Sequence, residues 1–161
     1  MCRPAYVQHQ LATLAPPGIT PEETIRFNIV LGVEDGRIAL RLELDKSRSL
    51  DFIPIGRDSV VEIALQGEQL YFSKDMDAIT TKEPLAALYG GLEYDGYEEK
   101  FDRYRIVRFA ARYNQGGKID TTHGFNVNVH LLQRFVDDEP RWIPLTIDPD
   151  IKNPPPMLMR Y

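Results

Sequence analysis

The sequence predicts an all-β fold, an antiparallel β-sandwich or partly open barrel of about seven strands with one short helix and extended terminal arms. Apolar and polar residues alternate in several separate stretches, which is the period of a half-buried strand. No helical pattern recurs between these stretches, so alternating strand-helix-strand units are not expected. With 161 residues, 43% of them hydrophobic, the chain is long enough for one core. We expect an N-terminal arm (1–23), a sandwich domain (24–148) and a proline-rich C-terminal arm (149–161).

The first hairpin is predicted within residues 24–45. Apolar side chains occupy odd positions from Ile25 to Val33 and even positions from Ile38 to Leu44, with Asp35-Gly36 between the two sets. A two-residue Asp-Gly turn pairs Val33 with Ile38 and puts both apolar sets on one face of the sheet. Pattern and turn chemistry therefore predict the same register.

A second hairpin is predicted within residues 59–73 by the same reasoning. Val61, Ile63 and Leu65 precede Gly67-Glu68, and Leu70 and Phe72 follow it. Glycine at the first turn position suits a type II′ turn.

A third antiparallel pair is predicted between residues 104–113 and 123–132, because both stretches alternate with their apolar residues at odd positions. Their polar residues would share one face, namely Arg108, Arg112, Asn126, Asn128 and His130. Guanidinium and amide groups suit an acidic or carbohydrate ligand, so this row is our candidate ligand-binding surface. The plainer interpretation is the solvated face that a half-exposed antiparallel sheet carries anyway.

The last predicted strand covers residues 141–147. Pro144 cannot donate a ladder hydrogen bond, which favours a position at a sheet edge, and Trp142 points away from Ile143. We expect Trp142 to be either covered by another layer or an interface anchor. Asp148 and Asp150 would lie on one side of an extended chain, but two carboxylates do not make a calcium site. Asp148-Pro149 is therefore interpreted as the point where strand pairing ends, and both aspartates as possible partner contacts.

The stretch between residues 75 and 102 lacks a strand pattern. A proline and two glycines bracket a possible short helix within 80–91. The tyrosine-rich segment after it is interpreted either as a partner contact, with Tyr94 and Tyr97 as candidates, or as a soluble loop whose tyrosines cap the core.

Composition excludes several classes of function. A net charge of −5 without a basic run argues against nucleic-acid binding, and no apolar run is long enough to span a membrane. The single cysteine, Cys2, rules out an intrachain disulfide and a cysteine-based metal site. We find no catalytic motif and expect no catalytic residue, metal or cofactor in a cytoplasmic protein.

These observations lead to two functional hypotheses. The first is a non-enzymatic β-sandwich module that binds a protein partner or a second copy of itself through its edge strand and terminal arms. The alternative is a small-ligand-binding protein or hydrolase that uses the polar face around Arg108 and His130.

Overall fold

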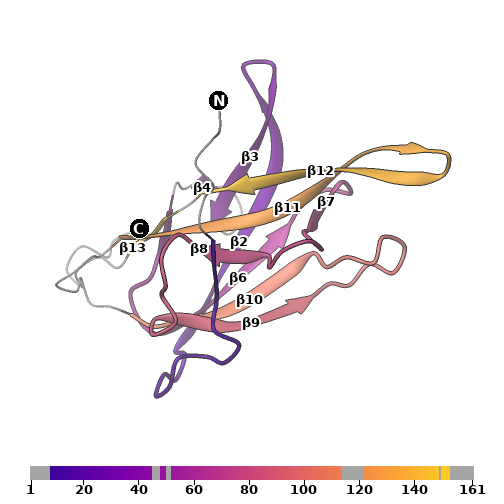
Figure 1. Cartoon of the computed structure of the whole chain (residues 1–161). Helices are drawn as coiled ribbons and strands as arrows, with labels where there is room; N and C mark the ends of the chain where they lie inside the picture. The colour runs from indigo at the N-terminus through magenta and orange to yellow at the C-terminus, as the bar shows by residue number, and fades with distance from the viewer. Residues whose placement is uncertain (1–7, 45–47, 50–51, 114–121, 149, 153–161) are drawn as a thin grey trace, which may run out of the picture.

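The computed structural model describes residues 8–44, 48–49, 52–113, 122–148 and 150–152, and these form two packed β-sheets (Figure 1). This confirms the predicted all-β sandwich class. One sheet has seven strands: β1 (His9–Gln10), β5 (Phe52–Pro54), β7 (Leu70–Phe72), β8 (Ile79–Thr81), β11 (Thr122–Val136), β12 (Glu139–Ile147) and β13 (Asp150–Lys152). The other has six: β2 (Glu23–Glu34), β3 (Arg37–Leu44), β4 (Arg48–Ser49), β6 (Ser59–Leu65), β9 (Tyr89–Asp95) and β10 (Ile106–Ala111).

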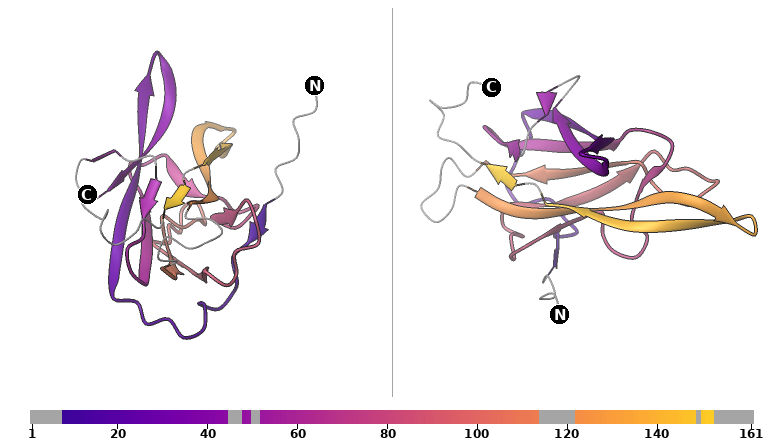
Figure 2. Two further views of the ribbon diagram at one scale, coloured as in Figure 1. Left: turned by 90° about the vertical axis from the view of Figure 1, so that its left-hand side faces the viewer. Right: turned by 90° about the horizontal axis from the view of Figure 1, so that it is seen from above.

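Strand β11 organises the seven-stranded sheet. Strands β7 and β8 pair with it along one edge, and β12 and β13 pair with it along the other. Figure 2, seen from above, shows β11 and β12 running side by side into a long hairpin. In the six-stranded sheet the order is β4-β3-β2-β6-β10-β9, with β2 and β6 parallel.

The core lies between the two sheets and comes from the alternating apolar positions of both. Ile63 and Phe109 of the six-stranded sheet are buried, as are Phe125, Val127 and Val129 of the seven-stranded sheet. The Phe109 and Phe125 rings lie 6.5 Å apart between centroids. Burial of these large side chains is the main favourable term in the stability of the sandwich.

The first predicted hairpin is confirmed in strand pairing and in register. Strands β2 and β3 pair Val33 with Ile38, and Asp35 (φ 50°) and Gly36 (φ 74°) both adopt positive φ. Two consecutive positive φ values are what a type I′ turn requires. At the hairpin end Val33 and Ile38 are exposed.

The second predicted hairpin is wrong. β6 pairs with β2 and β10, whereas β7 pairs with β11 in the other sheet. The chain between Leu65 and Leu70 therefore crosses from one sheet to the other. Both leucines are still buried, because strands in facing sheets direct their apolar side chains into the same core.

The predicted pairing of residues 104–113 with 123–132 is also wrong. β10 pairs with β6 and β9, and β11 belongs to the opposite sheet. The matching phase of their apolar residues reflects packing of the two strands face to face across the core, as the Phe109–Phe125 contact shows.

Two other expectations are corrected. The described residues contain no helix, and the expected helix region holds a turn in which Leu88 and Tyr89 donate backbone hydrogen bonds to Leu85 O. Strand pairing also continues past Asp148, since β13 pairs antiparallel with β11 and parallel with β5. Residues 1–7 and 153–161 of the expected arms lie outside the described residues.

The expected edge position of residues 141–147 agrees with the described pairing, in which β12 pairs with β11 alone. Pro144 lies opposite His130 in that pair. Within the described residues, no helix is long and apolar enough to cross a membrane.

Candidate functional site

An open cleft of about 410 Å³ lies where the β7–β8 loop meets the β9–β10 connection. This size is within the range of small-ligand sites. The lining residues are Gln10, Phe72, Ser73, Lys74, Asp75, Met76, Asp77, Tyr94, Asp102, Arg103 and Tyr104. Tyrosine rings and charged groups of both signs therefore share one opening.

The β7–β8 loop is held against β11 at both of its ends. Ser73 N donates to Asn128 O (3.1 Å), and Asn128 N donates to Ala78 O (2.8 Å). The Asn128 side chain adds a third contact, because its Nδ2 donates to Asp77 O (2.9 Å). Asn128 thereby fixes the loop that carries Lys74 and Asp75 into the cleft.

The β9–β10 connection is also anchored. Phe72 N donates to Tyr104 O (2.9 Å), and Glu98 N donates to Arg103 O (2.7 Å). Asp102 adopts φ 52°, a left-handed conformation that is uncommon for residues other than glycine. Aspartate tolerates this conformation in turns, and Asp35, Asp137 and Asp138 adopt it as well.

The Asp102 carboxylate lies between two donors at the rim of the cleft. Lys74 Nζ bonds to Oδ2, and Tyr97 Oη donates to Oδ1 (2.6 Å). The hydrogen bond from Lys74, followed by that from Tyr97, lowers the pKa of the Asp102 carboxyl below its usual value. Lys74 and Asp102 therefore form an ion pair at neutral pH on a solvent-accessible edge.

Three tyrosine rings form a row beside these charges. The ring centroids of Tyr94 and Tyr104 are 5.3 Å apart, and those of Tyr97 and Tyr104 are 5.1 Å apart. Ala78 N donates to Tyr94 Oη (3.0 Å), and burial raises the pKa of that hydroxyl. The rings are tilted by 49° and 48° within these two pairs, so the row forms an aromatic wall in which a planar ligand can stack on one ring at a time.

Beneath the cleft, Arg103 reaches His130 of β11. Arg103 Nε donates to His130 Nδ1 (3.2 Å), and the guanidinium carbon lies 3.8 Å from the Trp142 ring centroid. His130 Nε2 is 3.3 Å from Ser73 Oγ and 3.4 Å from Asp75 Oδ2. Burial of its side chain, followed by the positive charge of Arg103, lowers the pKa of His130. Among the described residues, no group of three histidine, cysteine or acidic side chains is arranged to hold a metal ion.

The predicted polar row is divided between the two sheets. Arg108 and Arg112 come from or directly follow β10 in one sheet, whereas Asn126, Asn128 and His130 lie on β11 in the other. The common face predicted from pairing of these two strands is therefore absent. Burial of the three β11 residues to 3% exposure or less further distinguishes them from a solvated sheet surface.

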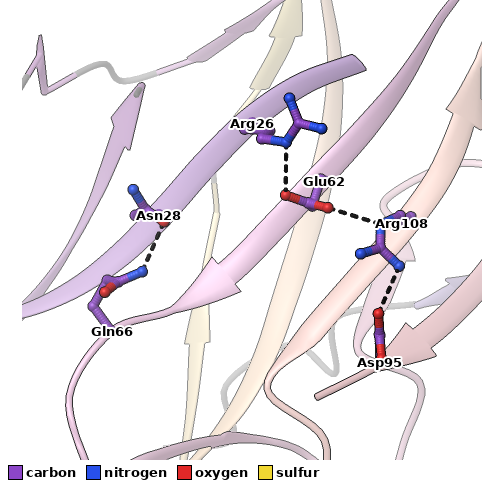
Figure 3. A network of polar contacts seen from close by, with 6 residues as sticks. All are labelled: Arg26, Asn28, Glu62, Gln66, Asp95 and Arg108. Carbon is purple, nitrogen blue, oxygen red and sulfur yellow. Dashed lines mark hydrogen bonds and ion pairs between the residues drawn. The ribbon is translucent and has the colours of Figure 1, made fainter. Parts of the chain in front are cut away.

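Arg108 lies in an ion-pair network that runs across neighbouring strands (Figure 3). Arg108 Nε donates to Glu62 Oε1 (2.7 Å), its Nη1 donates to Asp95 Oδ2 (3.1 Å), and Arg26 Nε lies 3.3 Å from Glu62 Oε2. Two arginines and two acids alternate there, so the positive charge of Arg108 is offset within the sheet. Arg112 contacts the backbone instead, donating to Ala87 O and Pro17 O.

The asparagines of β11 bind other parts of the chain. Asn126 Nδ2 donates to Thr80 Oγ1 (3.4 Å), and Thr146 Oγ1 donates to Asn128 Oδ1 (3.0 Å). Of the whole predicted row, His130 is the residue that the structure brings into direct contact with cleft-lining side chains.

The predicted partner contacts are dispersed. Tyr94 lines the cleft, Tyr97 adjoins it through Asp102, and Trp142 packs edge-on against the rings of Tyr71 and Phe101. Asp148 lies 3.8 Å from Lys82 Nζ, and Asp150 belongs to β13 and pairs with Gly124.

Sequence reasoning missed Lys74, Asp75, Asp102 and Arg103. A usable signal was present: Lys74 and Asp75 lie within three residues of the end of β7, and an Asp-Arg pair lies near the end of the tyrosine-rich segment. Loops that leave a rigid sheet commonly carry functional residues. The contact between Arg103 and His130, which are 27 residues apart, has no local signature.

The sequence of this chain also matches a known protein family. Residues 1–156 match the family pNTSase1, which is described as a predicted novel nucleotide synthetase. No curated protein matches the chain. A family of predicted synthetases overturns the expectation of a non-enzymatic interaction module, which relied on the edge strand, the terminal arms, Trp142 and the lack of familiar catalytic motifs. Since the match extends over nearly the whole sequence, this chain belongs to the family of predicted novel nucleotide synthetases, pNTSase1.

Proposed function

We propose that the protein is an enzyme that forms nucleotides and that its nucleotide substrate binds in the cleft beside β7 and β9. The observation that carries this proposal is the convergence of Lys74 and Arg103 with Tyr94 and Tyr104 around one opening of about 410 Å³. A nucleotide combines anionic phosphates with a planar base, so it needs cations and an aromatic surface within reach of each other.

The cations of the cleft match the phosphate end of such a substrate. Arginine and lysine donate charge-assisted hydrogen bonds to phosphate oxygens, and arginine can do so with two nitrogens at once. Lys74 is half exposed and borders the same opening as Arg103. An incoming phosphate can therefore compete with Asp102 for the Lys74 ammonium group.

The tyrosine row matches the base. Stacking of a nucleobase on an aromatic ring contributes roughly 1–3 kcal/mol per base and tolerates different bases. Tyr104 is 40% exposed and touches both Tyr94 and Tyr97, so it presents ring surface at the cleft. Asp75 and Asp77 on the same lining can accept hydrogen bonds from ribose hydroxyls or base amino groups.

Other depressions fit a nucleotide less well. The depression near Ile143 is lined mainly by aliphatic side chains, with Asp148 its one charged lining residue among those described. The groove beside β9 and β10 contains Arg108, which already binds Glu62 and Asp95.

A fourth depression, near Phe101 and Phe135, contains Arg105. Its guanidinium group donates to the backbone oxygens of Leu65 and Gly67. Its other cation, Lys100, lies over the rings of Phe101 and Phe135. Among the depressions lined by described residues, we therefore favour the cleft at Lys74, where an exposed ammonium group and Arg103 border the same opening as two tyrosines.

The proposal is tested by product formation. The purified chain is incubated with each ribonucleoside triphosphate and Mg²⁺ or Mn²⁺, and products are separated by anion-exchange chromatography and identified by mass. Loss of the Lys74 ammonium removes a charge-assisted contact, so Lys74→Ala should lower turnover about tenfold or more. Lys82→Ala removes a lysine outside the cleft lining and serves as the matched control.

Equal turnover by Lys74→Ala and Lys82→Ala would place the chemistry elsewhere on the molecule. A nucleotide product whose formation depends on Lys74 and on Tyr104 would support the cleft as the active site. Tyr104→Ala tests the aromatic wall and should weaken nucleotide binding by removing the central ring of the row.

Two further expectations from the sequence remain proposals about this enzyme. We propose a cytoplasmic location, which cell fractionation tests, and association with a protein partner or a second copy, which native mass spectrometry tests.

A further inference from the structure

Arg103 is held in one orientation by contacts on several sides. Its Nε donates to His130 Nδ1 (3.2 Å), and its Nη1 donates to Phe101 O (2.9 Å). The guanidinium carbon lies 3.8 Å from the Trp142 ring centroid, a cation–π contact. Among the described residues, Arg103 Nη2 has no hydrogen-bond partner, and Arg103 lines the cleft.

The contact with Arg103 also determines where the His130 proton lies. A guanidinium group has only donors, so His130 Nδ1 must accept through its lone pair. A neutral imidazole then carries its proton on Nε2, which faces Ser73 Oγ (3.3 Å) and Asp75 Oδ2 (3.4 Å). Each imidazole nitrogen thus has a complementary partner.

This arrangement is the reverse of a Ser-His-Asp triad. In a triad the histidine Nε2 accepts the serine proton and Nδ1 donates to the carboxylate. Here Nε2 is the donor, and Ser73 Oγ also accepts a hydrogen bond from Asp75 N (3.1 Å). His130 in this tautomer supports Arg103 and does not activate Ser73 as a nucleophile.

We infer that Arg103 is the phosphate-contacting residue of the cleft, that it does so through Nη2, and that His130 and Trp142 are its positioning residues. This inference rests on the proposed nucleotide site and adds which group binds phosphate and what holds that group in place. His130 is 3% exposed, so the support beneath Arg103 is a packed part of β11. A side chain fixed before the ligand arrives loses less conformational entropy when it binds.

The same geometry makes phosphate binding sensitive to acid. The charged or titratable groups facing His130 are Arg103 from the β9–β10 connection, Asp75 from the β7–β8 loop and Tyr71, its cross-strand neighbour on β7. If Nδ1 of His130 were protonated, its N–H would face the N–H of Arg103 Nε with no acceptor between them, and this hydrogen bond would be lost. Because burial and Arg103 lower the pKa of His130, this loss occurs at pH values below the ordinary histidine range.

The test measures binding to the full chain by isothermal titration calorimetry, with the four ribonucleoside triphosphates and inorganic tripolyphosphate as probes. Arg103→Lys should weaken binding of all five probes about 10- to 100-fold, since a charged hydrogen bond to phosphate is lost. Arg41→Lys makes the same chemical change on β3, outside the cleft lining, and should leave affinity unchanged.

His130 is tested by two variants and by a pH series. His130→Phe removes the acceptor and should weaken binding nearly as much as Arg103→Lys, whereas His130→Gln keeps an acceptor oxygen and should retain more affinity. Wild-type affinity should fall as the pH drops below the ordinary histidine range, and the affinity of His130→Gln should not follow that fall. A wild-type fall that His130→Gln reproduces would overturn the inference.

Because variants of the buried residue His130 can fail to fold, the tautomer of His130 is also measured by NMR on the wild-type protein. The imidazole ¹⁵N shifts of His130 at neutral pH should report the Nε2-protonated tautomer, and the Nδ1-protonated form would refute the argument. If none of the five probes binds the wild-type chain, the proposed nucleotide site fails as well. If probes bind and Arg103→Lys behaves like Arg41→Lys, the site stands and this inference alone is wrong.

Discussion

Gly90→Ala probes how the N-terminal segment is attached to the sandwich. Gly90 of β9 forms an isolated bridge with Ala12, and the adjacent Gly91 N donates to Ala12 O (2.9 Å). A Cβ added at Gly90 would lie 2.4 Å from Leu14 O, a backbone atom that must retreat to 3.0 Å or more. The segment between β1 and Leu14, which begins at the cleft-lining residue Gln10, would then have to shift.

The expected size of the effect comes from that clash. Backbone displacement by an inserted methyl group costs about 1–3 kcal/mol of unfolding free energy. For a chain of this size, each kcal/mol lowers the melting temperature by roughly 2–4 °C. Hydrogen exchange at the Gly91 amide should also become faster, because its acceptor moves away.

Gly32→Ala is the matched control. Gly32 is also a strand glycine outside the left-handed region, and the three atoms nearest to a Cβ there all belong to the flexible Arg41 side chain, the closest at 3.4 Å. We expect this variant to be as stable as the wild type or more stable by up to about 1 kcal/mol, because alanine lowers the conformational entropy of the unfolded chain. Urea unfolding gives both values. If Gly90→Ala matches Gly32→Ala in stability and in Gly91 amide protection, the close approach is not a constraint on this fold.

Two other substitutions give separable outcomes. Tyr89→Phe removes the buried hydroxyl that lies 2.7 Å from His123 Nδ1 and leaves that nitrogen without this partner. Urea unfolding should therefore show a loss of about 1–3 kcal/mol in the free energy of unfolding. An unchanged unfolding midpoint would contradict the buried contact. Arg108→Ala breaks an ion-pair network at the surface and should lower the free energy of unfolding by about 1 kcal/mol or less. Nucleotide affinity, measured by calorimetry, should not change. A large drop in affinity would mean that the cleft is not the binding site.

The sequence predicted which side of each strand is buried but not which strands pair with each other. The alternation in β6 and β7 fits a hairpin, in which the apolar side chains of two paired strands lie on one face of the same sheet. It fits equally well two strands in opposite sheets whose apolar side chains point toward each other. Leu65 and Leu70 are buried in either case. The same ambiguity led to the incorrect pairing of β10 with β11, whose apolar residues meet across the core. Periodicity reports which side of a strand is buried and carries no information about its neighbours.

The sequence by itself determined the all-β class and the register of the β2–β3 hairpin. Both depend on local chemistry: the two-residue period of apolar side chains, and the ability of Asp35 and Gly36 to adopt positive φ. Tertiary structure alone decided the candidate site. Ser73 and Arg103 lie 57 and 27 residues before His130, and only the meeting of two loops above β11 brings the three together. Long-range contacts of this kind depend on which strands become neighbours, and local side-chain preferences do not specify that choice.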